Sequence, residues 1–225
     1  DYARAMADGG LLAFIACLGL AQLSHETTPA VAQLAFSALL FYGFSALPYR
    51  TIGPHLAIAL GALGLALSGA PALGLLWCLS GTALHHWDTN TSDSQHTVLW
   101  RRYGSTFALL GYAALAGLLA WWLGLWRWRL SLPPLAWSTV DGFVQLLIWF
   151  TWPAWPLALW TLWRWRHQWW TKTPQRHLAW PLGFALIAIT ASLLMGDSDR
   201  TLLLALPALA SLAAFALPTL QRQVS

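Results

Sequence analysis

Charge and cysteine are both scarce in this chain of 225 residues. Only 9% of its residues are charged, against roughly 25% in an ordinary soluble domain, and a disordered chain needs more charge still. The two cysteines, Cys17 and Cys78, each lie inside an apolar run and form no Cys-x-x-Cys pair, so the usual zinc and redox motifs are absent. The GxxxxGK[ST] phosphate loop is also missing. These absences exclude a disordered segment, a zinc-finger protein and an ATP-driven machine of the P-loop type.

Apolar length is what the chain has in abundance. Hydrophobic residues make up 58% of it, including 17 Trp, and the mean hydropathy is +0.55. Runs long enough to cross a bilayer recur from end to end, and lipid favours helices because each backbone polar group must then be satisfied within its own segment. We therefore predict an all-α, polytopic integral membrane bundle, with residues 1–225 forming a single transmembrane domain.

The apolar runs predict about eight transmembrane helices. Two of them are short, and the sequence between them, LSGAPALG (residues 67–74), has the Gly and Pro expected of a tight helical hairpin. One long kinked helix is the alternative and would give seven spans. Pro153 and Pro156 should kink the span that contains them. The predicted spans are approximately 9–23, 29–48, 54–68, 71–84, 103–126, 142–163, 178–196 and 201–220.

Basic residues in the short loops set the predicted orientation. With the N-terminus inside and eight alternating spans, nine of the 12 Lys and Arg residues fall on the inner side and three on the outer side. This split obeys the positive-inside rule and predicts cytoplasmic N- and C-termini. Tryptophan clusters at 121–128 and 163–170 flank spans, where indole rings favour the headgroup level. The inner set is Arg4, Arg50, Arg101, Arg102, Arg164, Arg166, Lys172, Arg176 and Arg222, and the outer set is Arg127, Arg129 and Arg200.

Nucleic acid and haem are poor matches to this pattern. The net charge of +4 comes from residues in short loops, and no basic patch is interleaved with aromatics in the manner of a nucleic-acid surface. All seven histidines lie in loops or at span ends, and none lies at the middle of a span, where a bis-His haem would need them. The polar stretch at residues 85–102, with His85 and His86, is predicted to be a flexible, solvated inner loop.

Acidic residues on the predicted outer side suggest a catalytic surface. A sugar transferase that uses a lipid-linked donor needs a carboxylate to deprotonate the acceptor, and often cations to hold phosphate. The pair His25 and Glu26, between two spans, is the catalytic candidate. Ordinary polar loops between spans are the alternative explanation. The candidates for substrate binding are Asp141, Asp197, Asp199 and Arg200.

Three stretches resemble family 39 glycosyltransferases of the GT-C type, which include the lipid A aminoarabinose transferase and protein O-mannosyltransferase groups. GALGLALSGAPALGLL (residues 61–76) is similar to a helical hairpin of that family, and FTWPAWPLALWTLWRWR (150–166) and DRTLLLALPALASLAAFALPTL (199–220) look like its C-terminal half. The resemblance implies a multi-pass enzyme of the bacterial inner membrane. Such an enzyme moves a sugar from a polyprenyl-phosphate donor to a lipid or protein acceptor on the periplasmic face, with a divalent metal ion in some groups.

Two departures from the family pattern limit what the resemblance implies. The family's first-loop Asp would lie upstream of this sequence, so we expect the chain to be a fragment of a longer protein without that loop. The family's hairpin Lys-Gly is replaced by Gly69-Ala70, and Arg127, Arg129 or Arg200 would have to supply the cation. The alternative function is a non-catalytic membrane scaffold or a transporter-like subunit, although the absence of mid-span charges counts against a transporter.

Overall fold

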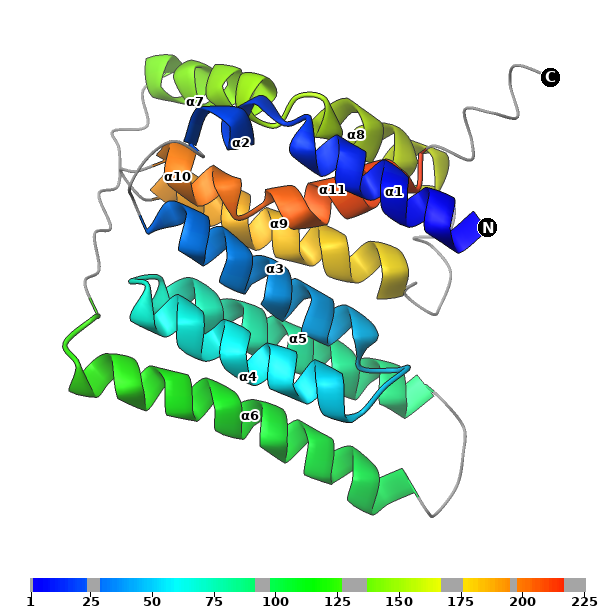
Figure 1. The fold of residues 1–225 in the computed structure, drawn as a ribbon, viewed down its shortest axis with the longest axis vertical. Coiled ribbons are helices and arrows are strands. Elements are labelled where there is room, and N and C mark those ends of the chain that lie inside the picture. The colour runs from blue at the N-terminus through cyan, green and yellow to red at the C-terminus, as the bar shows by residue number, and fades with distance from the viewer. Residues whose placement is uncertain are drawn as a thin grey trace. The chain divides into compact units, whose positions relative to one another are not determined.

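The computed structural model describes residues 2–23, 29–91, 98–126, 137–166, 176–194 and 198–216. Within these ranges every regular element is a helix (Figure 1), which confirms the all-α expectation. The chain divides into two compact units. Unit 1 comprises Asp1–Val31 and Arg129–Ser225, and unit 2 comprises Ala32–Trp128.

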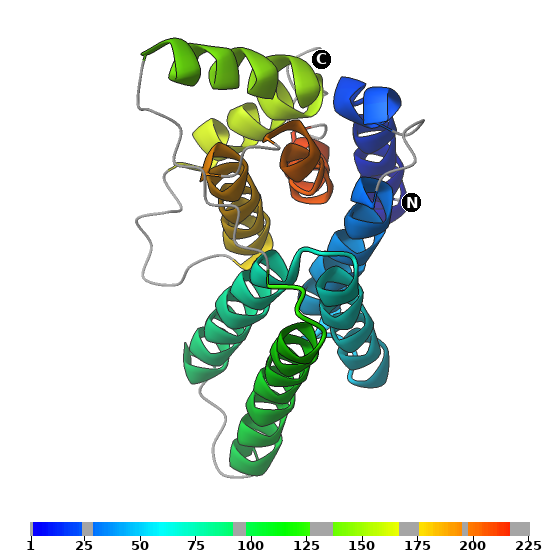
Figure 2. The same ribbon diagram turned by 90° about the vertical axis from the view of Figure 1, so that its left-hand side faces the viewer.

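Unit 2 is built from α4 (Ile52–Leu67), α5 (Pro71–Thr91) and α6 (Val98–Trp122), with nearly all of α3 (Ala30–Ala46). Helices α4, α5 and α6 contact one another pairwise and lie alongside each other in Figure 2. Helix α3 approaches α4 where glycines remove the side chain between them: a Cβ on Gly61 would lie 2.9 Å from the Leu40 nitrogen. A small residue therefore allows α3 and α4 to approach each other closely.

The turn between α4 and α5 explains why the two are separate helices and not one kinked helix. Gly69 has φ +93°, a left-handed conformation that glycine adopts without steric cost. The Ala70 N–H donates to the Leu65 carbonyl (2.9 Å), which is the long bond of a Schellman C-cap. The Gln33 side chain of α3 then donates to the Ser68 carbonyl (2.7 Å). The last carbonyls of α4 are thus satisfied at the turn.

Unit 1 contains seven described helices arranged around α11 (Leu206–Ala214). The others are α1 (Tyr2–Ile15), α2 (Leu18–Leu23), α7 (Trp137–Phe150), α8 (Ala154–Arg164), α9 (Arg176–Leu194) and α10 (Ser198–Leu203). Helix α11 contacts α1, α8 and α9, whereas α10 contacts α2, α7 and α9. The stretch from Leu202 to Leu206 is fully buried. The α10–α11 segment is therefore the core of this unit.

Three apolar runs that the sequence predicted as single spans are interrupted in unit 1. Run 9–23 contains the end of α1 and all of α2, run 142–163 contains parts of α7 and α8, and run 201–220 contains part of α10 and all of α11. Pro153 precedes α8 directly, and Pro207 lies in the first turn of α11. Because proline has no N–H to donate, it interrupts a helix or starts a new one.

The polar stretch at 85–102 differs from the predicted flexible loop. Helix α5 continues to Thr91 and α6 already begins at Val98, so only residues 92–97 lie outside the described helices of this stretch. His85 is only 7% exposed, and its Nε2 lies 3.2 Å from the Ser105 Oγ of α6. The prediction of a solvated polar loop was wrong for His85, because packing of α6 along α5 covers it.

Two described helices are long and apolar enough to cross a membrane. They are the Gly104–Trp122 part of α6 and the whole of α9, each with 19 residues, which gives roughly 28 Å of helix against a hydrocarbon core of about 30 Å. The pair α7 and α8 passes the same criteria jointly but is bent by 96°. Helices α3 and α4 are apolar and shorter. The described residues thus support two or three crossings.

Candidate functional site

Of the six predicted site residues, the structure describes Asp141, Arg200 and the backbone of Asp199. Asp141 lies in the second turn of α7, and Arg200 lies in α10; both side chains are exposed. Asp199 precedes Arg200 in α10, and only its backbone is described. His25, Glu26 and Asp197 lie outside the described residues. In the sequence, the first two follow α2 closely and Asp197 directly precedes α10.

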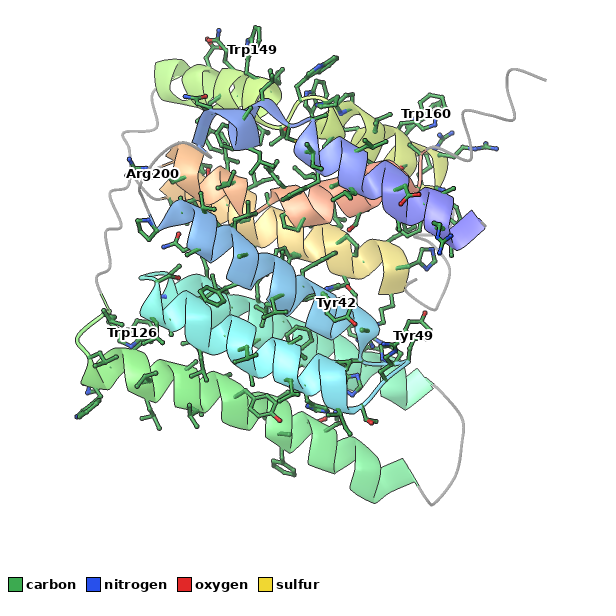
Figure 3. All side chains as sticks on the ribbon, viewed as in Figure 1. Tyr42, Tyr49, Trp126, Trp149, Trp160 and Arg200 are labelled. Carbon is green, nitrogen blue, oxygen red and sulfur yellow. The ribbon has the colours of Figure 1, made fainter. Side chains whose placement is uncertain are left out.

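Helices α2, α7 and α10 contact one another, and α7 and α10 carry Asp141 and Arg200 (Figure 3 labels Arg200). The structure therefore brings together the elements that bear or adjoin all six predicted site residues, although α2 ends more than 100 residues before α7 begins. This arrangement places a carboxylate and a guanidinium on neighbouring helices. A carboxylate can accept a proton from a hydroxyl, and a guanidinium can bind phosphate in a bidentate manner.

The contact between α2 and α7 depends on a glycine. A Cβ on Gly19 would overlap the ring of Phe150, and Phe150 itself is only 3% exposed. Gly19 therefore allows the last turn of α7 to lie directly against α2. This close approach fixes the position of α7, the helix that carries Asp141.

The break between α1 and α2 lies against the break between α7 and α8. The Leu18 N–H donates to the Trp152 carbonyl (3.2 Å), and the Cys17 Sγ lies 3.2 Å from the Ala13 carbonyl oxygen. The Thr151 hydroxyl donates to the Leu147 carbonyl (2.8 Å). The Leu18 N–H and the Ala13 and Trp152 carbonyls at the breaks thus have partners inside the protein, which is the condition for non-helical backbone at membrane depth.

No cluster of three or more His, Cys, Asp or Glu side chains suited to a metal ion occurs in the described parts of the chain. Histidines of unit 2 have aromatic or hydroxyl neighbours instead: the ring of His55 packs edge-on against Tyr112 at 6.0 Å, and His85 lies against Ser105. A divalent metal ion, which the resemblance implies for some groups of the family, would need at least one ligand from outside the described residues.

Sequence reasoning expected a kink at Pro153 but missed the break between α1 and α2 that faces it. The interruption at residues 16–17 has no proline to mark it, so neither hydropathy nor residue type indicates that α1 ends at Ile15. The nearby Gly19 was the one available signal, because a glycine inside an apolar helix often marks a close approach of another element.

The comparisons with known proteins give no relative for this chain. No protein-family model matches it, and no curated protein or solved structure matches it either.

Proposed function

We propose that the protein is a membrane glycosyltransferase of the GT-C type. It would move a sugar from a polyprenyl-phosphate donor to a lipid or protein acceptor on the periplasmic face. The convergence of α2, α7 and α10 carries the proposal, because these helices bear or adjoin all six residues selected for that chemistry. The sequence resemblance of the α4–α5 hairpin to family 39 enzymes supplies the reaction class.

Each residue has a role in the proposed reaction. Glu26, assisted by His25, removes the proton from the acceptor hydroxyl, whose oxygen then attacks the anomeric carbon of the donor sugar. The bond between that carbon and the phosphate oxygen breaks, and the polyprenyl phosphate leaves with both electrons. Arg200 offsets the negative charge of the phosphate. Asp141, Asp197 and Asp199 would bind hydroxyl groups of the sugar or a divalent metal ion.

The proposed setting is the bacterial inner membrane, crossed about eight times, with seven crossings as the alternative. Helices α6 and α9 have the length and apolar composition of spans. Helices α3 and α4 and the broken pairs of unit 1 would cross together with their neighbours, since their backbone groups are satisfied by protein. Both ends of the chain would be cytoplasmic, and the α2–α7–α10 end would face the periplasm.

Transfer by the full-length protein, purified with a radiolabelled polyprenyl-phosphate sugar, tests this function. Glu26→Gln should abolish most transfer, and Arg200→Gln should weaken donor binding. Asp8→Asn is the matched control, because Asp8 is an exposed carboxylate on α1, a helix outside the α2–α7–α10 end. Absence of transfer in the wild type, or equal activity of wild type and Glu26→Gln, would contradict the proposal.

A non-catalytic scaffold or transporter-like subunit is the second candidate, and the interrupted helices of unit 1 favour it. Discontinuous helices often form substrate or ion sites in transporters, because they present backbone polar groups within the membrane. The contact between Leu18 and Trp152 joins two such breaks. This function predicts uptake or partner assembly without any chemical change to a lipid-linked sugar.

A further inference from the structure

The end of unit 1 opposite the candidate site is assembled from four helices. The Trp165 ring, directly after α8, packs edge-on against His177 of α9 at 5.8 Å, and His177 lies 5.7 Å from Phe215, at the end of α11. Helix α1 joins them, since a Cβ on Gly10 would lie 3.4 Å from the Ala214 Cβ. Three helix termini therefore lie beside one another here, namely the end of α8, the start of α9 and the end of α11.

Arginine gathers at this end. Arg164 ends α8, Arg166 follows two residues later, and Arg176 begins α9. Arg4 lies six residues before Gly10, or about 9 Å along α1, and Figure 1 shows the start of α1 on the same side as the end of α8. Asp8 is the described carboxylate on this part of α1. Four arginines against one aspartate make the surface strongly basic.

Arg166 is held in a defined position at this surface. Its guanidinium lies over the Trp163 ring, 4.6 Å from the centroid, and its Nη1 donates to the Trp163 carbonyl (3.2 Å). Trp163 is 57% exposed, and Arg166 is also exposed. Trp163 therefore holds Arg166 in an outward-facing position, and the remaining N–H donors of Arg166 can bind another acceptor.

The exposed side of α8 changes character along its length. Leu159 is 54% exposed and is followed four residues later by Trp163 and then by Arg166. These three side chains thus change from apolar to aromatic to cationic over about 10 Å. That distance is comparable to the polar layer of a bilayer leaflet. The same order of chemistry occurs in that layer, from acyl chains through the interface to the headgroups.

We propose that Trp163 and Arg166, with Arg164 beside them, bind the headgroup of an anionic phospholipid. The guanidinium of Arg166 pairs with the phosphate oxygens, the Trp163 ring lies at the level of the glycerol esters, and Leu159 faces the acyl chains. An exposed leucine and tryptophan next to the cations favour lipid over nucleic acid, which would offer no acyl surface. This inference requires the protein to be in a membrane but does not depend on sugar transfer.

Native mass spectrometry of the detergent-solubilised full chain, offered an equimolar mixture of phosphatidylglycerol and phosphatidylcholine, tests the proposal. The wild type should retain phosphatidylglycerol preferentially, and Arg166→Gln should lower that retention about fivefold, the effect expected for one cation at an anionic surface. Arg166→Lys, which keeps the charge but loses the planar stack, should fall between them. Trp163→Ala should lower retention of both lipids.

Arg50→Gln is the matched control, because Arg50 is an exposed cation beside the exposed Tyr49 in unit 2. It should leave the preference unchanged. Equal losses for Arg50→Gln and Arg166→Gln would show a non-specific charge effect and overturn the proposal, as would a wild type that retains both lipids equally. Should Arg166→Gln lose its helical circular dichroism, raising the salt concentration on the wild type gives an independent result: an unchanged preference would refute a charge-based site.

Discussion

At the scale of single residues, the Thr161 hydroxyl joins two core helices of unit 1. Thr161 is fully buried in α8, and its hydroxyl lies 2.8 Å from the Leu212 carbonyl oxygen of α11. That carbonyl lacks its usual helical donor, because the Ala216 N–H donates to Ala213 instead (3.0 Å). The hydroxyl, which also lies 3.1 Å from the Leu157 carbonyl oxygen of its own helix, thus offers a donor to one carbonyl at the end of the central helix.

Thr161→Val removes this hydroxyl while keeping the shape of the side chain. A buried carbonyl without a partner should lower the free energy of unfolding by about 1 kcal/mol, measured by thermal or denaturant unfolding in detergent. Thr161→Ser keeps the hydroxyl and is the control, with only a methyl group lost. A Val variant that is as stable as the wild type would show that the Leu212 carbonyl finds another donor.

Both cysteines should be protected from reagents in the folded protein. Cys17 and Cys78 are 0% and 1% exposed. A small, membrane-permeant maleimide should therefore label neither until sodium dodecyl sulfate unfolds the chain, as followed by mass spectrometry. Rapid labelling of Cys17 before unfolding would mean that the junction of α1 and α2 opens in solution.

Residue burial was the feature that the sequence predicted least well. The sequence places His85 beside His86, Asp88 and a run of Ser and Thr, and this polar composition indicates solvent. Its actual burial depends on Ser105, which is 20 residues away on another helix. Local composition contains no information about such a neighbour. Cys17 and Cys78, by contrast, are buried as their apolar surroundings indicate.

At the scale of elements, α3 and α4 of unit 2 approach each other through glycine. A Cβ on Gly61 would lie 2.9 Å from both the Leu40 nitrogen and the Phe36 carbonyl oxygen. Both are backbone atoms that cannot move without moving the whole of α3. The spacing of the two helices therefore depends on the absence of a side chain at this position.

Gly61→Ala should force α3 and α4 apart and destabilise the protein by about 1–3 kcal/mol. Gly111→Ala is the matched control, because Gly111 is exposed within α6 and a Cβ there meets nothing within 4 Å. That change should be neutral or stabilising by up to about 1 kcal/mol, since alanine favours helix. Thermal unfolding of both variants is the measurement. Equal stability of Gly61→Ala and wild type would refute the close packing.

Helix type was predictable from the sequence, whereas helix continuity was only partly predictable. Lipid-compatible apolar runs indicate helices, and the Gly and Pro of residues 67–74 indicate the turn that the structure has at Gly69. Pro153 correctly marked the interruption between α7 and α8. The break after Ile15 has no such marker. Its backbone is satisfied by Trp152, a tertiary partner that no local pattern reveals.

At the scale of the whole chain, the sequence assigned the charged residues of unit 1 to two sides of a membrane, and Arg176 begins α9 whereas Arg200 follows its end. Arg4, Arg164, Arg166 and Arg176 were assigned to the inner side from alternation alone, and the structure places their helix ends together around α11. The helices bearing Asp141 and Arg200, assigned to the outer side, contact each other. The catalytic assignment of His25 and Glu26 stays a prediction, since they lie outside the described residues.

We propose that the chain is threaded through a membrane with the basic end of unit 1 in the cytoplasm. Cysteine accessibility in spheroplasts tests it most directly, using Asp141→Cys and Arg166→Cys singly in a background with Cys17→Ala and Cys78→Ala. Both side chains are exposed. We expect an impermeant maleimide to label position 141 in intact spheroplasts and position 166 only after permeabilisation. Labelling of position 166 from outside would contradict it.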